Sequence, residues 1–466
     1  MSTQPLSTAQ LLAKYDRPGP RYTSYPTAVE FSGEFTEADY RRHLAAADSL
    51  GADVPLALYV HLPFCEERCL FCGCTSIITK HRDIAERYLD HVCLELDLLA
   101  AHLPHRRRLS QYHWGGGTPT HHPPADLERL FAATARHFEF TPDAEIAVEV
   151  DPRVTTHEHV VTLRKLGFNR FSMGVQDFDA EVQEAVHRVQ SFDLTKGLVD
   201  DARAEGFASV NIDLIFGLPR QTLDGFRRTL EQVIAIRPER VAVYSFAYVP
   251  WMKGHQRRLD QGTLPDAALK FGLIAAAIDA FTGAGYRQLG MDHFAVPEDE
   301  LARAVEDGRL HRNFMGYTVQ SARDMAAVGI SSISDVQGLY AQNVKQLPEY
   351  FRAVSEGRFP IERGRRLDAD DQLRRHVITQ IMCNFHLDMA DVERRFGIVF
   401  RDYFAKELAR LTGEDSPVSH GLLEVADGAL DVTPRGRLFV RNVCMAFDRY
   451  LEAMKNPDKP AFSRTV

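Results

Sequence analysis

Short β-rich runs alternate with helical stretches from about residue 54 to residue 295, and this alternation limits the possible folds more than any other feature. The expected strands are Leu56–His61, Gln111–Trp114, Glu145–Val150, Phe171–Val175, Val210–Phe216, Val241–Phe246 and Gln288–Asp292. The helical stretches between them include Ile84–Ala101, Ala125–Phe138, His157–Leu166, Asp193–Glu205 and Leu223–Ile236. Such alternation predicts βαβ units and a parallel sheet. Six or seven units favour a full or partial (β/α) barrel of the TIM type, with functional groups at the C-terminal ends of the strands.

The regions on either side of this alternation differ from it. Residues 1–53 are expected to form an N-terminal extended arm, because Arg17–Thr27 carries three prolines and cannot be a helix. The tyrosines of that stretch suggest that it lies against the rest of the protein. After residue 295 the alternation is lost, and residues 296–466 are expected to be a mainly helical C-terminal domain with a possible hairpin near Gly421–Val432. The barrel would then span residues 54–295.

The charge and the cysteine content exclude several classes of protein. The 466-residue chain has a net charge of −9, which argues against a nucleic-acid partner. We find no signal peptide and no uncharged apolar run of membrane-spanning length, so we expect a cytoplasmic protein with no membrane partner. Seven cysteines in a cytosolic protein are not expected to form a disulfide framework. Four of them fall within ten residues, and this clustering predicts a metal site.

The clustered cysteines form a C-x3-C-x2-C loop of Cys65, Cys69 and Cys72, with Cys74 two residues further on. A structural zinc site would need a second ligand pair, and none lies nearby. A closed four-iron cluster would take Cys74 as its fourth ligand after a single glycine, which is a tight geometry. An open cluster would use the first three cysteines and leave one iron free for a small chelating ligand. The residues alone leave these three possibilities open.

Polar and glycine residues follow the later strands. Three glycines, Gly115 to Gly117, end the second strand and allow the backbone to approach a ligand closely, although a tight turn is also possible. Glu149 is expected on an inward strand face, where it needs a partner such as a ribose hydroxyl, an amino group or a core arginine. Asp213 sits among apolar residues of a buried strand, and Arg188 is a possible partner for it. Structural pairing and ligand binding are both open for Asp213.

The cysteine loop resembles the signature of the radical S-adenosylmethionine (SAM) superfamily. This resemblance implies that the open iron chelates the amino and carboxylate groups of SAM. A reduced cluster then cleaves SAM to a 5′-deoxyadenosyl radical, which is the reactive species, so no side-chain acid or base is expected to be catalytic. The protein places the reactants and excludes water and oxygen.

Over nearly its whole length the chain resembles the oxygen-independent coproporphyrinogen III oxidase (dehydrogenase) family. The resemblance is carried by these stretches: Pro20–Pro26, Cys65–Cys74, Gly115–Thr118, Glu149–Pro152, Gly290–Phe294, His311–Phe314, Gly316–Thr318, Tyr340–Asn343 and Cys383–Phe385. It implies that the two propionates of coproporphyrinogen III become vinyl groups with loss of two CO2, giving protoporphyrinogen IX in haem biosynthesis without O2.

The same resemblance implies one [4Fe-4S] cluster and two SAM molecules. The residues matching the SAM that chelates the cluster are Tyr59, Gly116, Glu149, Ala247 and Ile333. Those matching the second SAM are Phe71, Gly117, Thr118, Gln176, Arg188 and Asp213. Cys74 matches the family's extra, non-ligating cysteine.

The tetra-acid substrate should meet basic side chains, and Arg21 in the arm is the candidate, with an ordinary surface or structural arginine as the alternative. His293 and His311 are further candidates, although a lone histidine commonly serves as a core hydrogen-bonding residue. Other expected partners are an electron donor for the cluster and a terminal electron acceptor, and the protein is expected to be a monomer. The rival functions are a related haem-binding chaperone, a radical enzyme with another substrate and an electron-transfer protein with a closed cluster.

Overall fold

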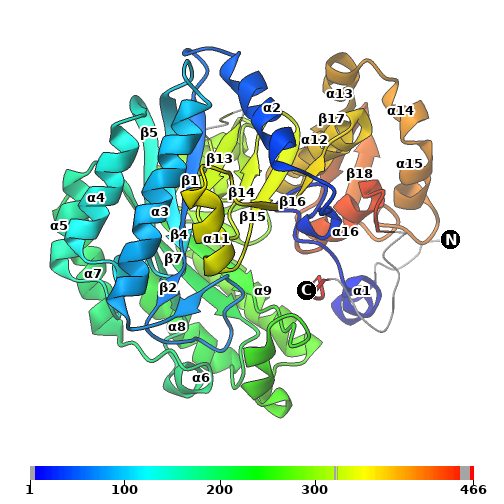
Figure 1. Ribbon diagram of the computed structural model, residues 1–466. Helices are drawn as coiled ribbons and strands as arrows, with labels where there is room; N and C mark the ends of the chain where they lie inside the picture. The colour runs from blue at the N-terminus through cyan, green and yellow to red at the C-terminus, as the bar shows by residue number, and fades with distance from the viewer. Residues whose placement is uncertain (1–5, 320–321, 323, 452–461, 466) are drawn as a thin grey trace.

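A twelve-stranded sheet organises the protein in the computed structural model, which describes residues 6–319, 322, 324–451 and 462–465 (Figure 1). Its central strands are parallel and adjacent in chain order: β1 (Leu56–Leu62), β4 (Arg108–Gly116), β5 (Glu139–Val150), β6 (Arg170–Gln176), β7 (Ser209–Phe216) and β8 (Arg240–Ser245). The sheet ends at β16 on one side and β9 on the other, without closing. The predicted partial barrel is therefore confirmed.

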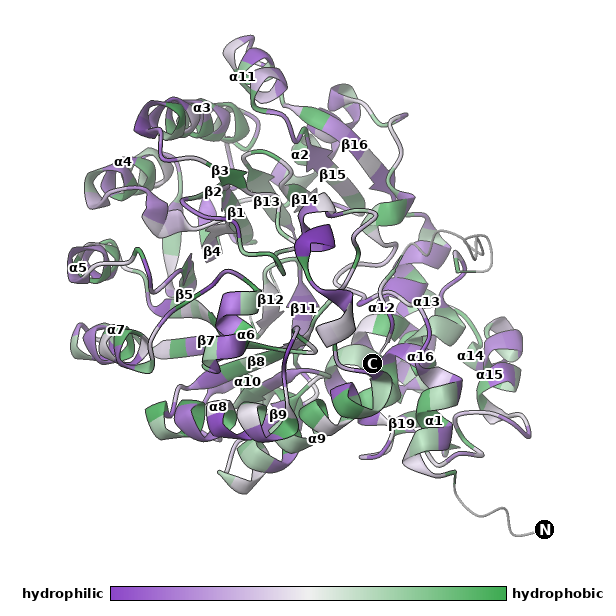
Figure 2. Cartoon of the chain, turned by 90° about the horizontal axis from the view of Figure 1, so that it is seen from below, coloured by the Kyte–Doolittle hydropathy of each residue, from purple (hydrophilic) through white to green (hydrophobic). Residues whose placement is uncertain are grey.

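Helices cover the outer face of these strands and lie in an arc around them (Figure 2). They are α3 (Arg82–Ala101), α4 (Pro124–Ala135), α5 (His157–Lys165), α7 (Phe192–Ala204) and α8 (Leu223–Ile236). In α8 the buried residues Phe226, Leu230 and Val233 recur every three to four positions, so one apolar face packs on the strands. The Thr222 hydroxyl accepts a hydrogen bond from the Gly225 amide and caps the start of that helix. The expected helices are confirmed within one to three residues at most ends.

The inner face of the barrel is polar, because buried apolar residues alternate with accessible polar ones along the strands. In β6 Phe171 and Met173 are fully buried, whereas Ser172 between them is accessible. In β7 the accessible positions include Asn211 and Asp213. A strand whose two faces differ in this way directs its polar side chains into the lumen of the barrel.

Short strands extend the sheet at both edges. On one edge β13 (Met325–Val328) pairs parallel with β1, followed by antiparallel β14 (Ile333–Asp335), β15 (Leu339–Asn343) and β16 (Ile361–Arg366). On the other edge the predicted strand near 288–292 is a hairpin of β9 (Arg287–Leu289) and β10 (His293–Ala295). The sheet therefore takes in residues 325–366, beyond the point at which the alternation ends. The division of the chain into three domains, residues 1–53, 54–295 and 296–466, stays a prediction.

The C-terminal helices enclose a second core. They are α12 (Ala369–Asn384), α13 (Met389–Phe396), α14 (Phe400–Tyr403), α15 (Ala405–Thr412) and α16 (Val440–Cys444). The core between them contains buried Val377, Ile381, Phe400 and Val440. A small sheet of β17 (His386–Asp388), β18 (Leu423–Ala426) and β19 (Ala429–Val432) lies beside them, and its β18–β19 hairpin matches the predicted one.

The N-terminal arm crosses both parts of the protein. Residues 17–27 contain no helix, as the prolines predict, and Tyr22 and Tyr25 pack in the C-terminal core. The Tyr22 hydroxyl donates to Asp448 at 3.0 Å. The arm also contains two helices that the sequence analysis did not predict, α1 (Thr8–Tyr15) and α2 (Glu37–Asp48). In the part of the chain that is described, no helix is both long and apolar enough to span a membrane.

Candidate active site

The cysteine loop leaves the barrel at the C-terminal end of β1. Two short strands, β2 (Phe64–Cys65) and β3 (Ile77–Ile78), pair parallel and hold the two ends of the loop together. The Thr79 amide donates to the Cys65 carbonyl at 3.1 Å and strengthens this closure. The loop and the ends of β4 to β7 enclose a cavity of about 160 Å³, lined by all four clustered cysteines.

The thiols of the loop have polar and basic neighbours. Cys69 Sγ accepts hydrogen bonds from Arg188 Nη1 at 3.5 Å and Arg153 Nη2 at 3.6 Å, and guanidinium groups favour the thiolate that an iron ligand must be. Cys65 Sγ lies 3.5 Å from the Thr118 hydroxyl. A hydrogen bond with Cys74 lowers the pKa of Cys72 to about 6.

The donor set fits an iron–sulfur cluster better than a mononuclear site. Among the described residues, no three histidine, cysteine or acidic side chains converge tightly enough to hold one metal ion. A cubane is larger, and each thiolate binds a different iron. Cys65, Cys69 and Cys72 line one cavity, which fits a cubane that takes one thiolate for each of three irons.

Two glycines let the end of β4 approach the cysteine loop. A Cβ atom on Gly117 would lie 2.5 Å from the Pro63 carbonyl, and the Gly117 amide donates to the Leu62 carbonyl at 2.8 Å. Gly116 has a φ of 118°, and a Cβ there would lie 2.5 Å from the His61 ring. Only glycine fits at these positions, so the glycine run is a close approach between strands and more than a simple turn.

Glu149, near the end of β5, presents a carboxylate to the cavity. Its Oε2 accepts from the Gly116 amide at 3.1 Å and its Oε1 from His113 Nε2 at 3.2 Å. Burial acts to raise the pKa of Glu149, but the hydrogen bonds from His113 and Gly116 hold it below its usual value. The side chain is still 45% exposed, so its oxygens have room for an ammonium or hydroxyl donor. Its structural partner is a histidine, and not an arginine.

The opposite wall of the cavity carries polar atoms without partners. Gln176 Oε1 and Arg188 Nε are buried and have no hydrogen-bond partner among the described residues. Burial raises the pKa of Asp213 to about 7, and Asn211 donates to this carboxyl group at 2.8 Å. The suggested ion pair between Asp213 and Arg188 is wrong, because Arg188 pairs with Asp151 at 3.0 Å. Buried polar atoms left unsatisfied at a cavity indicate a polar ligand.

The structure brings together most of the predicted SAM residues, but not all of them. Gly116 and Glu149 of the first set line the cavity, as do all six residues of the second set. Tyr59 lies outside the lining, with its hydroxyl 3.1 Å from His61 Nδ1 and its ring stacked on His113. Ala247 follows β8, where its carbonyl accepts from Gln256 at 3.1 Å. Ile333 on β14 packs against the cluster of Phe31 and Tyr340. The cofactor roles of all these residues stay predictions.

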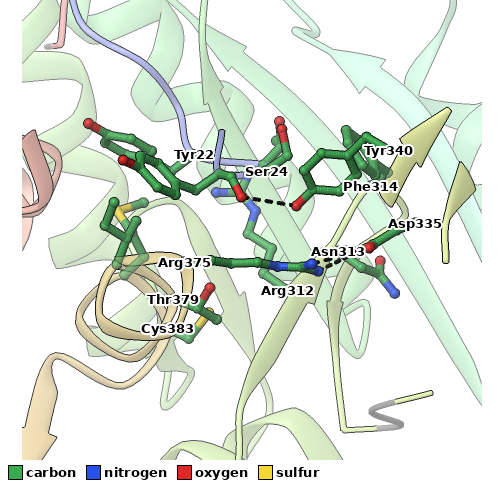
Figure 3. A pocket seen from close by; sticks show the side chains of 14 residues that line it. Tyr22, Ser24, Arg312, Asn313, Phe314, Asp335, Tyr340, Arg375, Thr379 and Cys383 are labelled. Atoms are coloured by element: carbon green, nitrogen blue, oxygen red, sulfur yellow. Dashed lines mark hydrogen bonds and ion pairs between the residues drawn. The ribbon is translucent and has the colours of Figure 1, made fainter. Parts of the chain in front are cut away.

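Arg21 reaches from the arm to the C-terminal end of β8, where its guanidinium donates to the Ser245 carbonyl. Arg312, on β11 (His311–Asn313), donates to the Arg21 carbonyl at 3.2 Å and lies over the Tyr317 ring. Arg312 and Arg375 line the same pocket (Figure 3), and Arg375 pairs with Asp335 at 3.1 Å. In the described part of the chain, neither Arg21 nor Arg312 forms an ion pair with a carboxylate.

The two candidate histidines differ in their surroundings. His293 Nδ1 lies 2.7 Å from Asp292, and its Nε2 lies 3.4 Å from the Tyr244 hydroxyl near the end of β8. His311 is largely enclosed, and burial lowers its pKa to about 4. His293 is the better candidate, because it contacts a residue near the C-terminal end of a barrel strand, where functional groups are expected.

Sequence reasoning missed several residues of the site. Arg153 and Asp151, which form an ion pair beside Cys69, follow directly on the strand that carries Glu149. Their position at a strand end was a usable signal. Arg312 had no such signal, because only the folded hairpin of β11 and β12 (Gly316–Thr318) brings it to the arm.

Comparisons with known proteins agree with this site. Residues 59–233 match the radical SAM superfamily, and residues 367–439 match the HemN C-terminal domain. The chain is 44% identical over 458 residues to the oxygen-independent coproporphyrinogen III oxidase of Escherichia coli K12 and 42% identical over 463 residues to that of Pseudomonas aeruginosa, with 98% of each chain covered. The solved structure of coproporphyrinogen III oxidase (HemN) from Escherichia coli, a radical SAM enzyme, matches with a TM-score of 0.89 and 42% identity over 96% of this chain and 100% of that one. This chain therefore belongs to the oxygen-independent coproporphyrinogen III oxidase family of the radical SAM superfamily.

Proposed function

We propose that this protein converts the two propionate side chains of coproporphyrinogen III into vinyl groups, with loss of two CO2 and without O2, giving protoporphyrinogen IX. The observation that carries the proposal is the single cavity in which the cysteine loop, the glycine run and Glu149 meet, in a chain with full-length relatives of this activity. The haem-binding chaperone is not favoured by those relatives.

The cofactors that this function needs match the residues of the cavity. Cys65, Cys69 and Cys72 would hold a [4Fe-4S] cluster, with Cys74 as a neighbour that does not bind iron. When bound, the cluster and SAM supply a carbon-centred radical that can take hydrogen from an unactivated carbon. Glu149 and the Gly116 backbone would hold the first SAM through its polar groups. Gln176, Arg188 and Asp213 would hold a second SAM, and the unpaired atoms of Gln176 and Arg188 support that assignment.

The substrate carries four carboxylates, and two arginines at the mouth of the barrel suit them. Arg21 and Arg312 converge from separate segments, and among the described residues neither forms an ion pair, although the Asp292 carboxylate is close enough to attract both guanidinium groups. An enclosed guanidinium without an ion-pair partner favours an anionic ligand. We assign these two side chains to propionate binding. Arg375, which Asp335 neutralises, is the matched arginine without such a role.

The same proposal includes partners and a location. An electron donor must reduce the cluster, and a terminal acceptor must take the electron that remains after decarboxylation. The net charge of −9 favours no nucleic-acid partner. We propose a cytoplasmic monomer that has no membrane partner.

Anaerobic reconstitution with iron and sulfide, followed by reductant, SAM and coproporphyrinogen III, tests this function. We expect 5′-deoxyadenosine, methionine and, after oxidation, protoporphyrin. Cys72→Ser should prevent assembly of the cluster, whereas the matched control Cys74→Ser should retain it. Haem binding without turnover would contradict the proposal, and loss of the cluster in Cys74→Ser would indicate four-thiolate ligation.

A further inference from the structure

The segment that follows β8 covers the cysteine loop from one side. His255 Nε2 lies 2.9 Å from the Cys72 carbonyl, and Gln256 Nε2 donates to the Phe71 carbonyl at 3.2 Å. Lys253 Nζ donates to the Cys74 carbonyl at 3.3 Å. Residues 253–256 therefore fix the backbone of the loop, and whatever lies beside them on the surface is close to the cluster site.

A second segment contacts the same loop, after helix α6 (Ala180–Ala185). The Leu70 amide donates to the Val186 carbonyl at 2.9 Å, and Arg188 donates to Cys69 Sγ at 3.5 Å. Leu70 and Val186 share a small apolar cluster with Phe246 and Leu259. Both segments therefore border the cysteine loop.

The two segments expose large apolar side chains. Val189 is 65% exposed, Trp251 46% and Met252 61%, and each is on one of the two segments. The other tryptophan of the chain, Trp114, is fully buried. Large exposed apolar groups beside a functional loop mark a surface for another molecule, and tryptophan and methionine are enriched in protein interfaces.

The segment that follows β8 is basic in an acidic protein. Residues 247–258 include Lys253, Arg257 and Arg258 and no acidic residue, whereas the chain as a whole has a net charge of −9. Arg257 and Arg258 are exposed, and neither forms an ion pair within the described ranges. The exposed acidic residues on or next to these segments include Glu66 and Glu67 of the cysteine loop, Glu184 of α6 and Asp260, and Glu67 lies 3.7 Å from Arg153. Positive charge beside an acidic background steers a negatively charged partner to this site.

We infer that the surface of Val189, Trp251, Met252, Arg257 and Arg258, here called the donor surface, binds a small acidic protein that carries single electrons on a flavin or iron–sulfur centre. The inference rests on the proposed function, because it supplies the electron that the cluster requires. One electron leaves the reduced carrier, which is oxidised, and enters the cluster, which is reduced. The apolar residues seat the carrier over the cysteine loop, and the arginines orient it.

The test uses the reconstituted holoenzyme with reduced flavodoxin as an acidic probe. The variant is Arg257→Glu/Arg258→Glu, and the matched control is Arg394→Glu/Arg395→Glu, an exposed adjacent pair on α13 with the same change in charge. Calorimetry measures the affinity for flavodoxin, and stopped-flow absorbance measures reduction of the cluster. At low salt we expect the variant to bind and react about tenfold or more weakly, with a smaller salt dependence than the wild type.

Reduction by dithionite separates this inference from the proposed function. Dithionite needs no docking surface, so both double variants should be reduced by it, and should turn over substrate, as the wild type does. Equal affinity of the variant and the wild type for flavodoxin would overturn the inference, as would equal weakening in the control. A wild-type dimer that Trp251→Ala converts to monomers would assign the surface to a second copy of the chain. Absence of turnover with dithionite would contradict the proposed function instead.

Discussion

A buried carboxyl group on the outer side of the barrel makes stability depend on pH. Glu95, on helix α3, is 1% exposed and accepts three hydrogen bonds of 2.7 Å, from the Tyr350 hydroxyl, Asn343 Nδ2 and the Gly329 amide. Gly329 directly follows β13, Asn343 ends β15, and Tyr350 is on α11 (Leu347–Ser355). The hydrogen bonds of Glu95 therefore link helix α3 of the barrel to the edge strands of the sheet, one of which carries Ile333.

The size of the effect follows from the pKa. Burial raises the pKa of Glu95 from 4.5 to about 7, although the hydrogen bonds from Tyr350, Gly329 and Asn343 oppose this. Because the folded pKa lies above the unfolded one, the stability that the protonated group contributes is complete below pH 4.5 and is lost as the pH rises through about 7. At about 1.4 kcal/mol per unit of pKa, the loss is about 3 kcal/mol.

Glu95→Gln tests this reasoning, because the amide keeps the size of the side chain and does not ionise. Urea unfolding, followed by the fluorescence of buried Trp114, gives the free energy of unfolding between about pH 5 and pH 8.5. The variant should be the less stable protein at the acid end, because an amide cannot accept all three hydrogen bonds. Over this range the wild type should lose about 3 kcal/mol relative to the variant.

The control is Glu86→Gln, at an exposed position on the same helix, and it should not change the pH dependence. A difference between the wild type and Glu95→Gln that stays constant with pH would refute the reasoning. That result would mean that the three hydrogen bonds stabilise an ionised carboxylate throughout.

Three further changes address the site and the arm. Glu149→Gln should weaken SAM binding about 10- to 100-fold in equilibrium dialysis, because a charge-assisted hydrogen bond contributes about 1.5–3 kcal/mol. Unchanged affinity would show that Glu149 does not bind SAM. Gly117→Ala should abolish SAM binding while the far-UV circular dichroism stays the same, because the new Cβ atom would lie 2.5 Å from the Pro63 carbonyl. Normal SAM binding by this variant would contradict the close approach of β4 to the cysteine loop. Arg106→Met should lower the free energy of unfolding, measured in urea, by about 3–5 kcal/mol, because it leaves Asp324 buried without its ion-pair partner. A loss below about 1 kcal/mol would show that this ion pair is dispensable.

The parallel strands and their helices were predictable because each is a long segment with one dominant period. The apolar face of α8 and the alternating β6 and β7 are examples of such patterns. The cysteine loop was predictable as a metal site from the clustering of its cysteines, and its resemblance to the radical SAM signature indicated the open cluster. Glu149 was predictable as an inward acid for the same reason of strand alternation.

Other features depend on contacts between distant parts of the chain. Strands β13 and β14 have four and three residues, too short for alternation to be seen, and they exist because β1 offers a free edge. The ion-pair partner of Arg188 could not be predicted from the sequence either, because Asp151 lies 37 positions away, directly after strand β5. Arg312 reaches Arg21 over a separation of 291 residues. No local pattern encodes such pairings.

The two predicted SAM sites differ in how far the protein already satisfies their polar groups. At the first, the Glu149 carboxylate is occupied by His113 and the Gly116 amide, so a ligand there adds to an existing network. At the second, Gln176 Oε1 and Arg188 Nε have no partner in the described part of the protein. A ligand at the second site therefore supplies hydrogen bonds to buried atoms that otherwise lack them, and each such atom left unsatisfied costs about 1–3 kcal/mol. We therefore expect a ligand to stabilise the protein more at the predicted second site than at the predicted first site, and binding there should tighten the wall of the cavity that carries β6 and β7.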